Sequence, residues 1–316
     1  MLINRRKLLQ ISAAAASMGL MGAKASLFVP DNQIARWRGV VLGGEASMAV
    51  AHPNKLRAKE VLEKAVLELR RLEEIFSLYS PTSALSALNS DGVVELPPIE
   101  LVMLLSTARQ ISEASKGIFD VTVQPLWDHY SRSKESDSSG LSAALSLVGQ
   151  QHLTITGEKI SMHTGQKITL NGIAQGAITD HLTALFKREG FDDILLGTGE
   201  IRAMGSKSND KPWRVALGSV GGPVVDLRDS AIATSEPVTQ LAEGSAYHLY
   251  NPRSGVGDAL YKRVSVEAST ATIADGLSTA LCLMHEDEWS QLLAQYSGYV
   301  RAIYVEKLDG QTVQLL

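Results

Sequence analysis

The sequence predicts an α+β protein, and three observations lead to this fold class. Apolar residues recur at helical spacing in long segments, most clearly over residues 54–76. Short runs rich in Val, Ile and Leu, such as 264–268 and 300–306, are typical of strands. These helices and strands follow one another without the repeating βαβ rhythm of a doubly wound sheet, which favours α+β.

The N-terminal half is expected to hold a strand, two helices and an exposed polar loop, at residues 40–51, 54–76, 97–115 and 131–140. Gly43 and Gly44 interrupt the strand. The second helix begins at Pro97-Pro98 and closes at Lys116-Gly117, since proline suits the first turn of a helix and glycine its end. The polar loop has no apolar residues to bury.

The C-terminal half is expected to alternate short strands with three helices. The helix over 174–189 is stopped by Gly190. The other two helices are expected at 271–284 and 286–296, and the strands at 153–155, 168–170, 193–196, 201–205, 213–217, 264–268 and 300–306.

Composition excludes several classes of protein. The 316 residues are 45% hydrophobic and 20% charged, as in ordinary globular proteins. The 30 Lys and Arg against 34 Asp and Glu give a net charge of -4, which lacks the basic field that nucleic-acid binding needs. The one cysteine, Cys282, excludes an internal disulfide and a four-cysteine zinc site, so oxygen or histidine must hold any metal.

The first 25 residues are expected to be a signal and not part of the fold. Arg5-Arg6 precedes an apolar, Ala-rich run that ends in Ala23-Lys24-Ala25, a small-x-small cleavage pattern. The run is too short to span ~30 Å of hydrocarbon, which argues against a permanent membrane anchor. We therefore expect a twin-arginine signal peptide at 1–25, a periplasmic product and a single domain over 26–316; the alternative is a chance basic start on a cytosolic protein.

Two glycine-rich segments could bind phosphate. Residues 170–176 follow a strand and open a helix, so their N–H groups could bind an anion or could simply form a tight turn. The segment from Gly197 to Glu200 leads into a second strand, whereas a dinucleotide fingerprint requires a helix there.

Asp275 and Thr279 are four residues apart, which places both oxygens on one face of a helix. Both are hard donors suited to Mg²⁺, or they are ordinary residues of an exposed face. Asp120 lies in an apolar stretch, as a cap or as a ligand contact. His248 could be a general base or a hydrogen-bonded structural histidine.

These motifs occur together in a familiar order, and over residues 40–305 the chain resembles the ApbE family of FAD:protein FMN transferases. The matching blocks are Leu42-Gly43-Gly44, Phe76 to Tyr79 with Asn89, Gly117 to Leu126, Leu170 to Gly176 with Asp180, Ala233-Thr234-Ser235, His248 to Gly255 and Ala274 to Ala280. The resemblance implies mixed antiparallel sheets with packed helices, an architecture related to the T-fold.

The resemblance also implies roles for single residues. The flavin or adenine contacts would be Leu42, Tyr79, Ile118, Phe119 and Asp120, with further FAD contacts from Thr169, Gln175 and Leu249. Metal ligands would be the carbonyl of Gly172 and the side chains of Asp275, Thr279 and Ser278. The chain departs from the family pattern at Leu42-Gly43-Gly44, at Thr169 and at Asn251-Pro252, but it keeps Asp275 and Thr279.

The implied reaction is Mg²⁺-dependent transfer of FMN from FAD to a Thr or Ser hydroxyl, with AMP leaving. His248 is the candidate base, and Asp275 is the second choice. The implied acceptor is a flavoprotein subunit of a membrane redox complex. The alternatives are a metal-dependent FAD pyrophosphatase and a flavin-binding protein without turnover.

Overall fold

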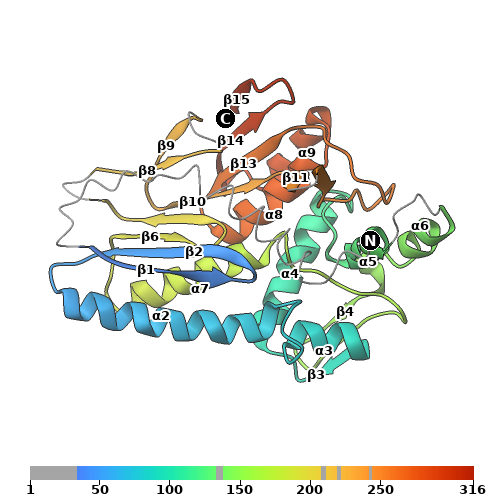
Figure 1. The fold of residues 1–316 in the computed structure, drawn as a ribbon, viewed down its shortest axis with the longest axis horizontal. Helices are drawn as coiled ribbons and strands as arrows, with labels where there is room; N and C mark the ends of the chain where they lie inside the picture. The colour runs from blue at the N-terminus through green and yellow to red at the C-terminus, as the bar shows by residue number, and fades with distance from the viewer. Residues whose placement is uncertain (1–33, 133–137, 208–210, 219–221, 242–243) are drawn as a thin grey trace.

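An eight-stranded antiparallel sheet is the centre of the molecule (Figure 1). The computed structural model describes residues 34–132, 138–207, 211–218, 222–241 and 244–316, so the expected signal at 1–25 lies outside the described residues. In spatial order the strands are β1 (Ile34–Val41), β2 (Gly44–Ala51), β6 (Ile194–Gly197), β7 (Ile201–Met204), β10 (Ser230–Ser235), β13 (Arg263–Ala268), β14 (Val300–Glu306) and β15 (Thr312–Leu315).

Helices and small sheets surround this sheet. The helices are α2 (Lys55–Phe76), α3 (Ala84–Asp91), α4 (Ile99–Ala114), α5 (Gln124–Arg132), α6 (Ser138–Leu145), α7 (Ala174–Arg188), α8 (Ala271–Cys282) and α9 (Trp289–Gln295), with 3-10 turns η2 (Val121–Val123), η3 (Gln150–His152) and η4 (Glu286–Glu288). The small sheets pair β3 (Val93–Glu95) and β4 (Thr154–Ile155) with β5 (Lys159–Ser161), β8 (Trp213–Ala216) with β9 (Val224–Leu227), and β11 (Val238–Leu241) with β12 (Gly244–Tyr247).

The main sheet buries apolar residues on both faces. Alternate residues of β6 point to opposite faces, because side chains alternate along a strand. Leu196 joins the large core formed with α2, α4, α7 and α8, whereas Leu195 packs with the β8–β9 hairpin around the fully buried Trp213. The fold class predicted from the sequence is confirmed.

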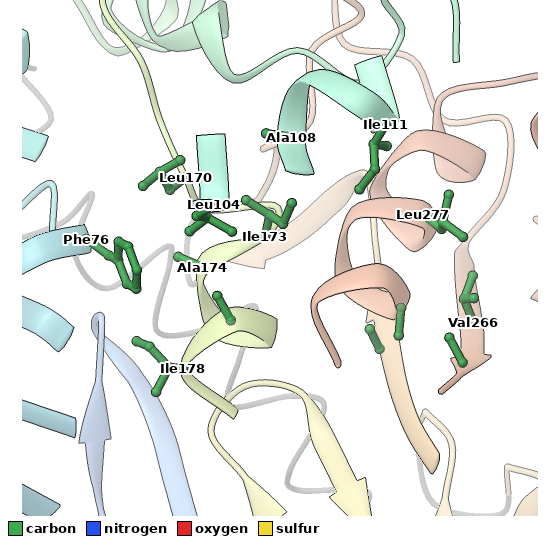
Figure 2. Packing of buried hydrophobic residues seen from close by; sticks show 14 of the residues in the cluster. Phe76, Leu104, Ala108, Ile111, Leu170, Ile173, Ala174, Ile178, Val266 and Leu277 are labelled. Atoms are coloured by element: carbon green, nitrogen blue, oxygen red, sulfur yellow. The ribbon is translucent and has the colours of Figure 1, made fainter. Parts of the chain in front are cut away.

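Close helix packing positions the segments that carry the candidate site. Figure 2 shows Ile173 and Ala174 of the α7 region, Ile111 of α4 and Leu277 of α8 in one buried cluster. Two glycines permit the approach: a Cβ at Gly176 would lie 2.4 Å from the carbonyl oxygen of Ala271, and a Cβ at Gly276 would lie 2.4 Å from Ile111 Cδ1. Helix α8 is therefore fixed against both neighbours.

Most expected elements are confirmed, including the helices over 54–76, 97–115, 174–189 and 271–284. The strand over 40–51 is interrupted at the glycines as expected: Leu42 and Gly43 have φ of 48° and 84°, and their turn makes the segment part of two paired strands, β1 and β2, and not of one strand. The strand over 168–170 was wrong, because the Asn89 side chain takes both backbone hydrogen bonds of Ile168. At 131–140, α5 and α6 take up both ends of the expected loop.

Sequence reasoning missed α3, α5, α6 and several short strands, among them β10, which supplies part of the site. Among the residues described, no helix combines the length and the apolar character needed to cross a membrane.

Candidate active site

A cavity opens at the ends of two central strands of the main sheet, where β7 begins and β10 ends. The start of α7, the second and third turns of α8, residues 118–127 and residues 248–252 contribute to its wall. It brings together most residues singled out from the sequence, namely Leu42, Ile118, Phe119, Asp120, Thr169, Gly172, Gln175, His248, Leu249, Asp275 and Thr279. Segments far apart in the sequence thus converge on one site.

Tyr79 and Ser278 are not among the residues that line this cavity. The Tyr79 ring lies beside the Leu42–Gly43 turn, since a Cβ at Gly43 would be 3.8 Å from Tyr79 Cε2. Ser278 is fully buried, and its hydroxyl lies 2.8 Å from that of Ser235 and donates to the carbonyl of Asp275. The proposed roles of Tyr79 in flavin binding and of Ser278 in metal binding remain predictions.

Asp275 lies on α8 with its carboxylate against the start of α7. The carboxylate is buried, and its Oδ2 accepts a 2.9 Å hydrogen bond from the Gly176 N–H. That N–H belongs to the first turn of α7, where backbone donors lack partners within the helix. The Gly176 N–H donates to Asp275, and the Ala174 N–H donates to the Leu170 carbonyl. The 170–176 segment is therefore a tight turn with few free N–H donors for phosphate.

Thr279 lies one turn after Asp275, directly against Gly172. A Cβ at Gly172 would be 3.0 Å from Thr279 Oγ1, closer than most side-chain contacts, so glycine allows this close approach. Asp275 and Thr279 are 4% and 9% exposed, which excludes the exposed-helix-face interpretation. The described residues contain no group of three or more His, Cys, Asp and Glu side chains placed for a metal, so the candidate donor set is carboxylate, hydroxyl and carbonyl oxygen, the chemistry that Mg²⁺ prefers.

Glu200 is a site residue that sequence reasoning missed. It follows Gly199 at the start of β7, lines the cavity and is 7% exposed. Burial and the charge of Asp275 hold the pKa of Glu200 well above its ordinary value, and burial likewise raises the pKa of Asp275. The available signal was an acidic residue placed directly after the glycines of 197–199, between two apolar strand segments.

His248 lies at the cavity wall, half-buried, and its backbone N–H donates to the Pro237 carbonyl at 3.0 Å. Burial lowers the pKa of its imidazole to about 4, because a charged ring would lose hydration there. The ring is therefore neutral at pH 7 and can accept a proton.

Asp120 caps the η2 turn and also lines the cavity. Its Oδ1 accepts hydrogen bonds from the Thr122 N–H at 2.7 Å and the Thr122 hydroxyl at 2.6 Å. Burial raises its pKa, and these hydrogen bonds oppose the rise. The capping interpretation is thus confirmed, and contact with a ligand remains a prediction.

Two further parts of the wall had no sequence prediction. Trp127 and Tyr250 form an aromatic corner, with ring centroids 5.5 Å apart at 87°. Arg263 and Glu236 form an ion pair of 3.3 Å at another part of the wall. The cavity wall therefore combines apolar and aromatic side chains with carboxyl groups, hydroxyls and an imidazole.

The ApbE family model matches residues 42–304 of this sequence, the span that contains every cavity-lining residue. The chain belongs to the ApbE family. The relatives include an FAD:protein FMN transferase of Vibrio cholerae serotype O1, 29% identical over 245 residues that cover 69% of this chain and 72% of the relative. A second relative of that name, from Rhodobacter capsulatus, is 29% identical over 66% of this chain and 43% of its own length.

Solved structures of ApbE proteins share the fold. The Flavin Transferase ApbE from Vibrio cholerae superposes with a TM-score of 0.78 over 89% of this chain and 96% of its own, at 22% identity. The apo form of the Pseudomonas stutzeri flavinyl transferase ApbE superposes with a TM-score of 0.77 at 25% identity, covering 89% of this chain and 94% of its own. These likenesses confirm the antiparallel α+β architecture that the family resemblance implied.

Proposed function

We propose that this chain transfers FMN from FAD to a Thr or Ser hydroxyl of an acceptor protein and releases AMP. The observation that carries the proposal is the cavity whose wall contains both the buried oxygen donors Asp275 and Thr279 and the neutral imidazole of His248. Family membership and the activity named for the relatives support it.

The reaction makes one bond and breaks one. The acceptor hydroxyl oxygen attacks the phosphorus on the FMN side of the FAD diphosphate, and the bond from that phosphorus to the bridging oxygen breaks. The bridging oxygen leaves with AMP. His248 takes the hydroxyl proton, a role that needs the ring uncharged at the start.

Asp275, Thr279 and the Gly172 carbonyl would hold the metal ion. Their oxygen chemistry and the buried, unneutralised carboxylate of Asp275 fit Mg²⁺. When bound, Mg²⁺ supplies positive charge that offsets the charge developing on a diphosphate. The Gly176 N–H keeps Asp275 oriented, and the hydroxyl of Ser235 lies 3.2 Å from that of Thr279 and restrains it.

The apolar side of the cavity would receive the planar rings of FAD. Leu42, Ile118, Phe119, Leu249 and Trp127 give it aliphatic and aromatic surface. Pockets for such ligands are lined mainly by apolar side chains with a few placed polar groups, as here.

The cellular setting follows from the sequence and belongs to the same proposal. Arg5-Arg6 and Ala23-Lys24-Ala25 support export by the twin-arginine route to the periplasm. The family resemblance supports a flavoprotein subunit of a membrane redox complex as acceptor.

The test incubates the purified protein with FAD, Mg²⁺ and a candidate acceptor. Flavin fluorescence on the acceptor in a denaturing gel is expected, and Asp275→Asn or EDTA should abolish it. Free FMN without labelled acceptor would instead show a pyrophosphatase. FAD binding without either product would show a flavin-binding protein.

A further inference from the structure

We propose that Glu200 is the second carboxylate of the cation site, acting together with Asp275. The inference rests on the cation site of the proposed function and adds a residue to it. It comes from the contacts of Glu200 with two chain segments that also position Asp275 and Thr279.

Glu200 is a buried carboxyl group without a cationic partner among the described residues. Its side chain is 7% exposed, and its Oε2 accepts a 3.2 Å hydrogen bond from the Thr234 N–H. Within the part of the chain that the structure describes, Oε1 accepts no hydrogen bond and no Lys, Arg or His forms an ion pair with Glu200. Glu200 lines the cavity, so a cation there could reach it.

The end of β10 connects Glu200 to the candidate ligands. Thr234 donates its N–H to Glu200, and the hydroxyl of the next residue, Ser235, lies 3.2 Å from Thr279 Oγ1. Adjacent Cα atoms are about 3.8 Å apart, so these contacts place Glu200 and Thr279 around one short segment.

The start of α7 gives a second, independent connection. The Gln175 side chain packs on Gly199, where a Cβ would lie 2.2 Å from Gln175 Cδ, and the next residue, Gly176, donates its N–H to Asp275 Oδ2. Glu200 is therefore connected to Thr279 through Thr234 and Ser235. The adjacent Gly199 is connected to Asp275 through Gln175 and Gly176.

Two buried carboxyl groups around one small volume cannot both be ionised without a counter-charge. Removing an anion from water is unfavourable, and a second anion nearby adds repulsion. A divalent cation would balance both charges, and Mg²⁺ accepts carboxylates either directly or through its retained waters. A monovalent ammonium or guanidinium group could balance one of them, but among the described residues that line the cavity the guanidinium is that of Arg263, which already pairs with Glu236 and Glu306.

Glu236 provides a matched control. It lines the same cavity and is also largely buried, but Arg263 pairs with it at 3.3 Å. Its charge is thus already compensated by the protein.

The experiment measures Mn²⁺ binding to the full mature chain without FAD, by electron paramagnetic resonance and calorimetry. Glu200→Gln keeps an acceptor for the Thr234 N–H and should weaken Mn²⁺ binding about 10- to 100-fold, the range seen when groups around a metal site are removed. Glu236→Gln should leave the affinity within about twofold, well below that range. Equal urea midpoints without metal would show that the variants are folded. If Glu200→Gln does not fold, Glu200→Asp, which withdraws the carboxylate by one methylene, should also weaken binding.

Unchanged Mn²⁺ affinity in folded Glu200→Gln, with weakened binding in Asp275→Asn, overturns the proposal and leaves the cation site intact. Unchanged affinity in both variants overturns the cation site itself. Weakened FAD binding with normal Mn²⁺ binding makes Glu200 a nucleotide contact, which also overturns the proposal.

Discussion

His248 lines the cavity, and its imidazole is neutral at pH 7 and can accept a proton there. General-base assistance contributes ~10² to 10⁴ in rate, whereas losing a binding contact mainly weakens substrate affinity. His248→Ala should therefore lower the transfer rate at saturating FAD by about that factor. Single-turnover transfer and the Kd for FAD measure the two effects separately.

His248→Gln provides the control, since an amide can hydrogen-bond but cannot accept the proton. It should be as slow as His248→Ala. A normal rate with weakened FAD binding would make His248 a cofactor contact and leave Asp275 as the alternative base.

The same histidine predicts a pH dependence of stability. Burial lowers its pKa from 6.5 to about 4, so the unfolded chain binds more protons between these pH values and the free energy of unfolding falls as pH falls through that window. Above pH 6.5 the residue adds no pH dependence. The loss should reach about 2 kcal/mol at pH 5. Urea unfolding of wild type and of His248→Gln at pH 7.5 and 5.0 isolates the contribution of His248 to this loss. An equal loss of unfolding free energy in both proteins would contradict the lowered pKa of His248.

At the scale of elements, the contact between α7 and α8 depends on Gly176. A Cβ there would meet the Ala271 carbonyl oxygen at 2.4 Å, and backbone cannot move aside cheaply. Gly176→Ala should lower the free energy of unfolding by about 1–3 kcal/mol, as overpacking does, and should reduce activity by displacing Asp275. Gly298→Ala is the control, because a Cβ at Gly298 meets nothing within 4 Å. Equal midpoints of urea unfolding for the two variants would contradict this prediction, because α8 would then accommodate a Cβ at position 176 without loss of stability.

Asp180 of α7 holds the first turn of α8. Its carboxylate accepts hydrogen bonds from the N–H groups of Ala271 and Thr272 at 2.9 and 2.8 Å and from the Thr272 hydroxyl at 2.7 Å. Hydrogen bonds to charged groups contribute about 1.5–3 kcal/mol, so Asp180→Ala should destabilise the protein by at least that amount in thermal or urea unfolding. Asp91→Ala is the control: Asp91 is exposed, so the change should alter the free energy of unfolding by less than about 0.5 kcal/mol. A similar loss of unfolding free energy in both variants would contradict the stabilising role of Asp180.

For the whole molecule, the N-terminal segment predicts export in a folded state. Replacing Arg5 and Arg6 by lysine should leave the precursor in the cytoplasm, because the twin-arginine pair is the feature that defines this route. Cell fractionation with detection of precursor and mature forms measures the result. Unchanged mature protein in the periplasm would exclude the twin-arginine route.

The sequence by itself determined the long helices, the fold class and the family. Helix 54–76 could be predicted because its apolar stripe is local, and the same holds for Gly190, the glycine that follows the end of α7. Asp275 and Thr279 could be paired because a helix fixes the distance between residues four apart.

Only the tertiary structure decided which segments meet. The strand expected at 168–170 is instead held by Asn89, 79 residues away, and the helix-start donors expected for phosphate are taken in part by Asp275, 99 residues from Gly176. Glu200 joined the site because Thr234 lies beside it on the neighbouring strand. Such contacts depend on strand order and helix packing, and the local spacing of residues does not encode either. Burial and charge compensation arise only when segments distant in the sequence are packed together.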